Sequence, residues 1–182
     1  MNMKKRILSM FFLALTLIVG AEFANAVPPV SGTGTVAVTA TTTSSVSLTF
    51  VTDGAGITLG GSGTSAATIA FGTLQAFGGT VPAGVTFIPS NGTTYGVSTP
   101  FDVNVNLSNS ASPDYTLTAA LQSADAVNTW GVGGTTLTTT AQALTVAGAY
   151  GTPTPYTFTL SIPVTATAGA ISNTMNFVAT AN

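Results

Sequence analysis

Four aspartates, Asp53, Asp102, Asp114 and Asp125, are the charged side chains that could do chemistry after residue 26. That part of the chain has no lysine, arginine, histidine or cysteine. An enzyme needs a base that titrates near working pH, an activated nucleophile or a bound metal. Two carboxylates can together hydrolyse a glycosidic bond, but the spacing of these four indicates no such pair. We therefore expect no enzymatic activity, no catalytic residue and no cofactor.

Calcium is the metal that carboxylate and carbonyl oxygens would favour, and the D-G-A-G segment at 53–56 is the candidate calcium loop. The segment lacks the further acidic ligands of a recognised calcium loop. Aspartate in a turn commonly accepts a hydrogen bond from its own backbone, and Asp114 and Asp125 also lie in or beside turns. We interpret these aspartates as turn residues and predict no metal site.

Charge also limits the partners that this chain can bind. Without cationic side chains after residue 26, nothing can neutralise phosphates, so binding to nucleic acid or to anionic lipid is not expected. The absence of cysteine leaves burial and backbone pairing as the sources of stability. A surface of low net charge favours self-association.

The first 26 residues have the three parts of a secretory signal peptide. Lys4, Lys5 and Arg6 form a charged region, residues 7–19 are apolar, and A-N-A at 24–26 is a small-residue cleavage site. The alternative, an uncleaved membrane anchor, is disfavoured because the apolar run is shorter than the roughly 20 residues that a spanning helix needs. We predict a protein that is secreted or held at the cell surface, exported through the periplasm if the cell has an outer membrane, with no membrane contact after cleavage.

Alternation of apolar and polar residues is the main structural signal after the signal peptide. In residues 35–50 the large apolar residues all occupy even positions, and no turn residue interrupts the run. Residues 101–108 and 115–122 also alternate, and we expect them to pair as an antiparallel hairpin. Trp130 is expected to pack against one end of the core. The remaining predicted strands are 57–59, 67–71, 85–88, 135–139, 144–146, 156–164 and 171–181.

No segment keeps a helical period over two turns, so the chain is predicted to be all-β. About eight or nine short strands separated by turn signals are typical of an immunoglobulin-like or Greek-key β-sandwich. We divide the chain into a signal peptide at 1–26, an N-terminal extension at 27–43 and a sandwich domain at 44–182. Asn91 and Asn106 each begin a triplet of the N-glycosylation type, a pattern that occurs by chance in such sequences.

Several short motifs resemble the spore coat protein U and archaic chaperone-usher pilin families of exported bacterial subunits. They are G-T-V-A-V-T-A-T at 34–41, S-V-S-L at 45–48, I-A-F-G-T-L at 69–74 and the stretch from Ile162 to Phe177. This chain would be a cysteine-free variant, because the families usually have a cysteine near Ser45. A second group of secreted, cysteine-free sandwich proteins has a similar pattern of F-G and P-A-G motifs.

The resemblance implies a sandwich that lacks one strand, which the N-terminal segment of a neighbouring subunit supplies by β-strand addition. Residues 35–43 would then be the donor strand, with Val36, Val38 and Ala40 as the side chains buried at the subunit interface. The implied partners are further copies of the chain in a homopolymer, a periplasmic chaperone and an outer-membrane usher. The expected function is that of a structural subunit of an extracellular fibre or pilus.

Two alternatives remain open at this point. The N-terminal strand could fold back within its own monomer. The protein could also be a monomeric secreted module that binds a carbohydrate or another surface. Aromatic residues that could line such a binding surface, Tyr95, Trp130, Tyr150 and Tyr156, are scattered along the chain, which favours the structural role.

Overall fold

The structure, a computed structural model, describes residues 37–182. The predicted signal peptide and Val36 lie outside the described residues. Residues from Thr42 onward form one compact unit, and residues 37–41 lie outside it. In the described part of the chain, no helix is long and apolar enough to cross a membrane.

The unit after Thr41 is all-β, as the alternation predicts. Its strands, in chain order, are β1 (Ser45–Val51), β2 (Thr86–Ile88), β3 (Thr94–Ser108), β4 (Tyr115–Leu121), β5 (Thr129–Val132), β6 (Thr135–Thr136), β7 (Gln142–Gly148), β8 (Thr154–Pro163) and β9 (Met175–Ala181).

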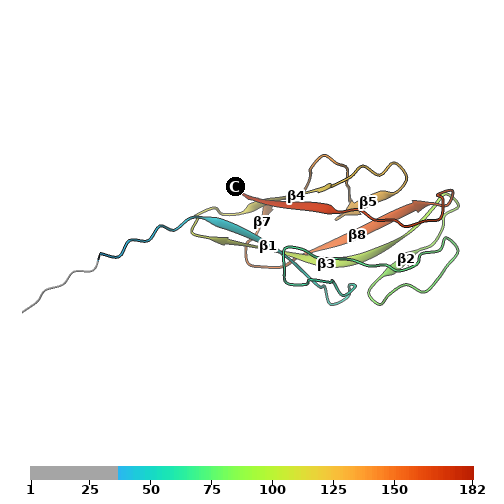
Figure 1. Cartoon of the computed structure of the whole chain (residues 1–182), viewed down its shortest axis with the longest axis horizontal. Coiled ribbons are helices and arrows are strands. Elements are labelled where there is room, and N and C mark those ends of the chain that lie inside the picture. Colours follow the sequence, from blue (N-terminus) through green and yellow to red (C-terminus); the bar gives the residue numbers. More distant parts are fainter. Residues whose placement is uncertain (1–36) are drawn as a thin grey trace, which may run out of the picture. The chain divides into compact units, whose positions relative to one another are not determined.

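The strands form two antiparallel sheets that lie against each other as the layers of a β-sandwich (Figure 1). The larger sheet has the order β1-β3-β8-β5-β6, with β2 paired to β3 beside β1, and the smaller sheet has the order β7-β4-β9. The predicted sandwich class is therefore confirmed.

The core lies between the sheets and consists of the inward side chains of the middle strands. Because side chains in a strand point alternately to the two faces, one row of each strand can be fully buried while the other faces solvent. The buried side chains of the inward rows of β3, β4 and β8 are Val97, Thr99, Phe101, Val103, Val105, Tyr115, Leu117, Ala119, Leu121, Tyr156, Phe158, Leu160 and Ile162.

Strand β3 begins earlier than the sequence predicts and passes through Pro100. Proline lacks an N–H group, so it is confined to places where no neighbouring strand needs that donor. Here β1 ends with the pair Val51–Asp102, and β2 pairs with β3 only from Ser98 backwards. Pro100 therefore lies in the gap between β1 and β2 along one edge of β3.

The predicted hairpin between residues 101–108 and 115–122 is wrong. β3 pairs with β1, β2 and β8 in the larger sheet, whereas β4 pairs with β7 and β9 in the smaller one. The connection, which includes Asn109 at φ 56°, carries the chain from one sheet to the other. The two alternating rows thus face each other across the core, an arrangement that the pattern alone does not distinguish from a hairpin.

The long strand predicted at 35–50 is also wrong in its first part. Strand β1 begins at Ser45, and residues 37–44 are exposed and belong to no strand. The reason is the length of the partner: Ser45 pairs with Ser108, the last residue of β3, so the ladder has no further residue to pair with. Alternation indicates which residues can form a strand, but a strand also needs a neighbour to bond to.

Two further predicted strands, at 57–59 and 67–71, are core-packing segments rather than strands. Ile57 and Leu59 are buried, and Phe71 stacks on Phe158 with ring centroids 5.4 Å apart. The fully buried hydroxyl of Thr99 fixes this region, because it accepts from the N–H of Ile57 at 2.9 Å and donates to the carbonyl of Gly84 at 2.8 Å. Side-chain packing and single hydrogen bonds thus replace a ladder here.

Candidate functional site

Strands β1 and β9 are the edges of the two sheets on the same side of the sandwich. Each pairs with one strand only among the described residues, β1 with β3 and β9 with β4. The ring of Phe50 on β1 meets the ring of Phe177 on β9 edge-on, with centroids 5.1 Å apart. We call the line along which these two edges face each other the seam.

Side chains along the seam are less buried than most inward side chains of the middle strands β3, β4 and β8. The inward residues of β1 and β9 that pack against the core are Val46, Leu48, Phe50, Met175, Phe177 and Ala179, and all of them are only partly buried. Most inward residues of β3, β4 and β8 are buried, and the exceptions, Tyr95, Leu107 and Thr154, lie near strand ends. A strand placed between β1 and β9 would cover the exposed part of these side chains.

Part of the edge of β1 is already occupied. The N–H of Phe50 donates to the carbonyl of Thr64 at 2.8 Å, and the carbonyl of Phe50 accepts from the N–H of Gly63 at 2.6 Å. These bonds cover only the last part of β1. The free edge that remains is the first part of β1 together with the whole length of β9.

The extension contains the residues that the family resemblance predicts at the subunit interface. Val38 is 85% exposed and Ala40 is also exposed, and neither lies in a strand. Val36 lies outside the described residues. The sequence did not indicate the residues of the seam as an acceptor, since β1 and β9 alternate in the same way as the fully covered strands.

Strand directions define two ends of the sandwich. β1 begins and β9 ends at one of them, where Ser45 pairs with Ser108 and Ala181 pairs with Tyr115 (Figure 1). We call this the extension end. At the opposite end β4 stops at Leu121, which pairs with Met175, the first residue of β9.

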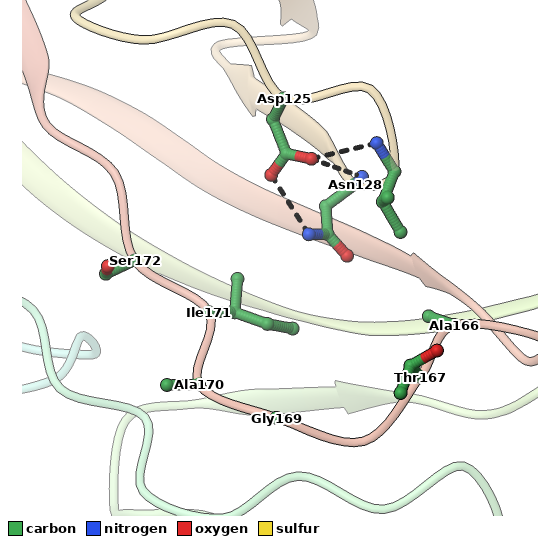
Figure 2. Close-up of a pocket in the computed structure, with 9 residues that line it drawn as sticks. Asp125, Asn128, Ala166, Thr167, Gly169, Ala170, Ile171 and Ser172 are labelled. Carbon is green, nitrogen blue, oxygen red and sulfur yellow. Dashed lines mark hydrogen bonds between the residues drawn. The ribbon is translucent and has the colours of Figure 1, made fainter.

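That opposite end contains a pocket of about 330 Å³ between the β4–β5 loop and the β8–β9 loop (Figure 2). Its lining residues are Asp125, Val127, Asn128, Ala166, Thr167, Gly169, Ala170, Ile171 and Ser172. We call it the loop pocket and call its end of the sandwich the pocket end.

Asp125 organises the β4–β5 loop. Its Oδ1 accepts from the backbone N–H groups of Val127 (2.9 Å) and Asn128 (2.8 Å). Its Oδ2 accepts from Nδ2 of Asn128 (2.9 Å) and from Nε1 of Trp130 (2.7 Å). The interpretation of Asp125 as a turn residue is therefore confirmed. The role of Trp130 as a core residue is also confirmed, since its side chain is buried in β5, a strand that the sequence analysis missed.

These donors decide the protonation state of Asp125. Partial burial would raise the pKa of its carboxyl group, but the hydrogen bonds from Asn128, Trp130 and Val127 outweigh it and hold the pKa well below its ordinary value. Partial burial, with the nearby negative charge of Asp53, raises the pKa of Asp102. Within residues 37–182 no three acidic, histidine or cysteine side chains come together to hold a metal ion.

The amide of Asn128 has one satisfied and one unsatisfied side. A carboxylate can only accept hydrogen bonds, so the contact with Asp125 fixes Nδ2 on that side. The carbonyl oxygen Oδ1 is then directed away from Asp125, toward the β8–β9 loop (Figure 2). It is buried and has no hydrogen-bond partner among the described residues.

Comparison of the whole chain with known proteins adds no assignment: no family model matches it, and no curated protein matches it.

Proposed function

We propose that this protein is the structural subunit of an extracellular fibre or pilus, and that the extension of one copy completes the sandwich of the next. One observation supports this proposal above the others. The core side chains along the seam stay partly exposed over the whole length of β1 and β9, while most of those of the neighbouring strands β3 and β4 are buried. A β-strand added at a free edge would contribute backbone hydrogen bonds together with this side-chain burial.

The alternating pattern of the extension suits this seam. If the donor runs antiparallel to β9 with Val36 opposite Ala181, then Val38 lies opposite Ala179 and Ala40 opposite Phe177. Each valine then faces an alanine, and the smallest of the three donor side chains faces the largest seam residue. Full burial of each valine contributes roughly 1.5 to 3 kcal/mol to the association.

A second copy is a better source of the donor strand than the same chain. To fill its own seam, the extension would have to reverse direction just before Ser45, in the stretch T-T-T-S at 41–44. Tight reversals between strands favour glycine, asparagine or aspartate, and this stretch has none of them. The reversed segment would run antiparallel to β1 and parallel to β9, whereas the proposed donor runs antiparallel to β9, the strand whose outer edge is free along its whole length.

A donor from a second copy gives a contact that propagates. The extension leaves its own sandwich at the extension end, where the carbonyl of Thr43 accepts from Nδ2 of Asn109 at 3.2 Å. A donor antiparallel to β9 enters the next sandwich from the pocket end. Such a head-to-tail contact uses two different surfaces and therefore builds an open filament.

The predicted signal peptide supports export, and the absence of titratable bases and thiols after residue 26 fits a structural role better than a catalytic one. In a cell with an outer membrane, a periplasmic chaperone and an outer-membrane usher are the assembly partners that we propose. Before assembly, the chaperone would cover the exposed seam.

Assembly of the mature chain tests the proposal. A double variant, Val36→Asp with Val38→Asp, places charges where the proposal buries valines, and we expect it to remain monomeric at concentrations at which the unchanged chain forms filaments. Val146→Asp is the matched control, because Val146 is 69% exposed on the smaller sheet, outside the seam. Sedimentation and electron microscopy provide the measurement.

Two results would contradict the proposal. Filaments formed equally well by the double variant would show that the extension is not the donor. An unchanged mature chain that stays monomeric at every concentration, and to which an added peptide of residues 30–42 does not bind, would favour the monomeric binding module instead.

A further inference from the structure

The connection between β1 and β2 contains a phenylalanine that the sandwich itself does not use. Phe77 is 95% exposed. The other phenylalanines that the structure describes all pack in or against the core: Phe50, Phe71, Phe87, Phe101, Phe158 and Phe177. An aromatic side chain buries a large apolar area when it finds a partner, and leaving that area in water is unfavourable. Phe77 is therefore a candidate contact residue for another molecule.

The backbone around Phe77 is held in place on both sides. Leu74 and Val81 pack against the core before and after it. The N–H of Gly78 donates to the carbonyl of Gln75 at 3.4 Å, and Gly78 has φ 113°, a backbone conformation that favours glycine. Phe77 thus projects from a tight turn, so binding through its ring would require little further ordering of the backbone.

The loop pocket at the pocket end offers a matching apolar site. Its volume of about 330 Å³ is within the range of pockets that hold small ligands. Val127 and Ile171 in its walls are 54% and 39% exposed, and Ile171 extends into the space between the two loops (Figure 2). Both oxygens of the Asp125 carboxylate already accept two hydrogen bonds each, so they have little capacity left for a cation or a polar ligand. An uncharged apolar group is the occupant that this pocket suits.

We propose that Phe77 of one copy of the chain inserts into the loop pocket of a second copy, where its ring covers Val127 and Ile171. The ring does not fill the pocket of its own chain, because it is almost fully exposed there. The charged residues nearest to Phe77 in the sequence are Asp53 and Asp102, so the turn itself is neutral. Copies whose only charged side chains after residue 26 are aspartates repel each other least through neutral surfaces of this kind.

The small area of this contact decides how it acts. A buried aromatic side chain covers about 150 to 250 Å², whereas a stable interface between two proteins buries about 1,200 Å² or more. Two free copies should therefore bind each other weakly, with a Kd of about 1 mM or above. In a fibre the contact would repeat at every subunit, and many weak contacts made together hold two fibres side by side. This last step rests on the proposed function, whereas the contact between two copies does not.

Two complementary variants test the contact between free copies. Both are made in the mature chain with Val36→Asp and Val38→Asp, so that filaments do not interfere. Phe77→Ser removes the ring and keeps the pocket, and Ala170→Trp fills the pocket and keeps the ring. Both substituted residues are exposed, so urea denaturation should show unchanged stability for each variant.

Nuclear magnetic resonance of the labelled pocket provides the measurement. In isotope-labelled Phe77→Ser, we expect the methyl signals of Val127 and Ile171 to shift when unlabelled Ala170→Trp is added at about 1 mM or above. The same concentration of unlabelled Phe77→Ser should leave them in place. Val146→Ser is the matched control, because Val146 is 69% exposed outside the pocket, and Ala170→Trp that also carries it should still cause the shifts.

Three results of this titration would refute the contact. The methyl signals of Val127 and Ile171 could stay in place with every added chain. They could shift equally with Phe77→Ser and with Ala170→Trp, which would mean that a surface other than Phe77 enters the pocket. The ring signals of Phe77 could respond to added cellohexaose and not to a second chain, which would assign Phe77 to carbohydrate binding instead.

Electron microscopy then tests the side-by-side arrangement in the chain with an intact extension. Phe77→Ser should form filaments as the unchanged chain does, but these filaments should no longer gather into bundles. Bundles that persist in Phe77→Ser would refute this role of the contact. If the unchanged chain forms no filaments at all, the proposed function fails, while the titration still decides whether Phe77 binds the loop pocket of a second copy.

Discussion

Shortening Val38 gives the most direct measure of how much the extension contributes to assembly. Val38 is 85% exposed and lies in no strand, so Val38→Ala removes no buried contact from the monomer. In the proposed filament the same side chain is buried opposite Ala179. Losing two buried carbons at about 0.8 kcal/mol each weakens the subunit contact by about 1.6 kcal/mol. That corresponds to about a 15-fold higher critical concentration for assembly.

The assay combines two measurements on the same preparation of the mature chain. Sedimentation of a concentration series gives the critical concentration, and urea denaturation below that concentration gives the free energy of unfolding of the monomer. We expect Val38→Ala to raise the critical concentration about 15-fold and to leave the free energy of unfolding unchanged. Val178→Ala is the matched control, because Val178 is 56% exposed on the outer face of β9 and should affect neither quantity.

Either of two results would refute this reasoning. An unchanged critical concentration would mean that Val38 is not buried on assembly. A lower free energy of unfolding of the Val38→Ala monomer would mean that Val38 is already packed within its own chain, in favour of a strand that folds back. Equal effects of Val38→Ala and Val178→Ala on assembly would indicate non-specific hydrophobic association rather than a specific contact at the seam.

Three further predictions concern the sandwich itself. Gly84 has φ +78°, and a β-carbon there would come within 2.1 Å of the backbone of Gly56. Gly84→Ala should therefore lower the free energy of unfolding by more than about 2 kcal/mol. Gly54 has open space around it, so the control variant Gly54→Ala should change the free energy of unfolding little. Thr99→Val keeps the shape of the side chain but leaves two buried backbone groups unpaired, and urea denaturation should show a loss of about 2 to 3 kcal/mol. The folded chain holds the pKa of Asp125 below its ordinary value of about 4, so the ionised carboxylate stabilises the fold at neutral pH, and this contribution is lost as the pH falls below about 4. The difference in free energy of unfolding between the unchanged chain and Asp125→Asn should therefore be largest near neutral pH and should shrink in acid.

Each of these predictions has a result that contradicts it. Equal stabilities of Gly84→Ala and Gly54→Ala would mean that the close approach of Gly84 to Gly56 is not present in solution. A neutral Thr99→Val would show that the backbone groups find other partners. A stability difference for Asp125→Asn that is constant from neutral to acid pH would mean that the carboxylate is not preferentially stabilised in the folded chain.

Alternation along the chain was enough to predict the fold class, because burial between two sheets requires one apolar row per strand. It was not enough to predict which strands pair. The rows that contain Val103 and Leu117 look alike in the sequence, yet they lie in different sheets and face each other across the core. Pairing depends on which edges are free, and a local pattern does not contain that information.

The seam illustrates the same limit at the candidate site. The resemblance to chaperone-usher pilins suggested the proposed donor residues, which lie in a run of alternating residues. The acceptor could not be predicted, because Phe177 has the same spacing as fully covered residues and differs from them only in lacking a neighbouring strand on one side. Strand β5 was missed because it is short and contains Gly131, which has no side chain to contribute to an alternating pattern.

The pairing of β1 with β3 has a mechanical consequence for a fibre of the proposed kind. Tension on the extension would pull β1 along its own axis toward the extension end, while the donor strand held by β9 would pull the rest of the sandwich the opposite way. The ladder between β1 and β3, which runs over all seven residues of β1, would then be loaded in shear, with its hydrogen bonds sharing the force instead of opening one after another. We expect such a fibre to resist stretching far better than a fibre in which the same ladder was peeled apart from one end.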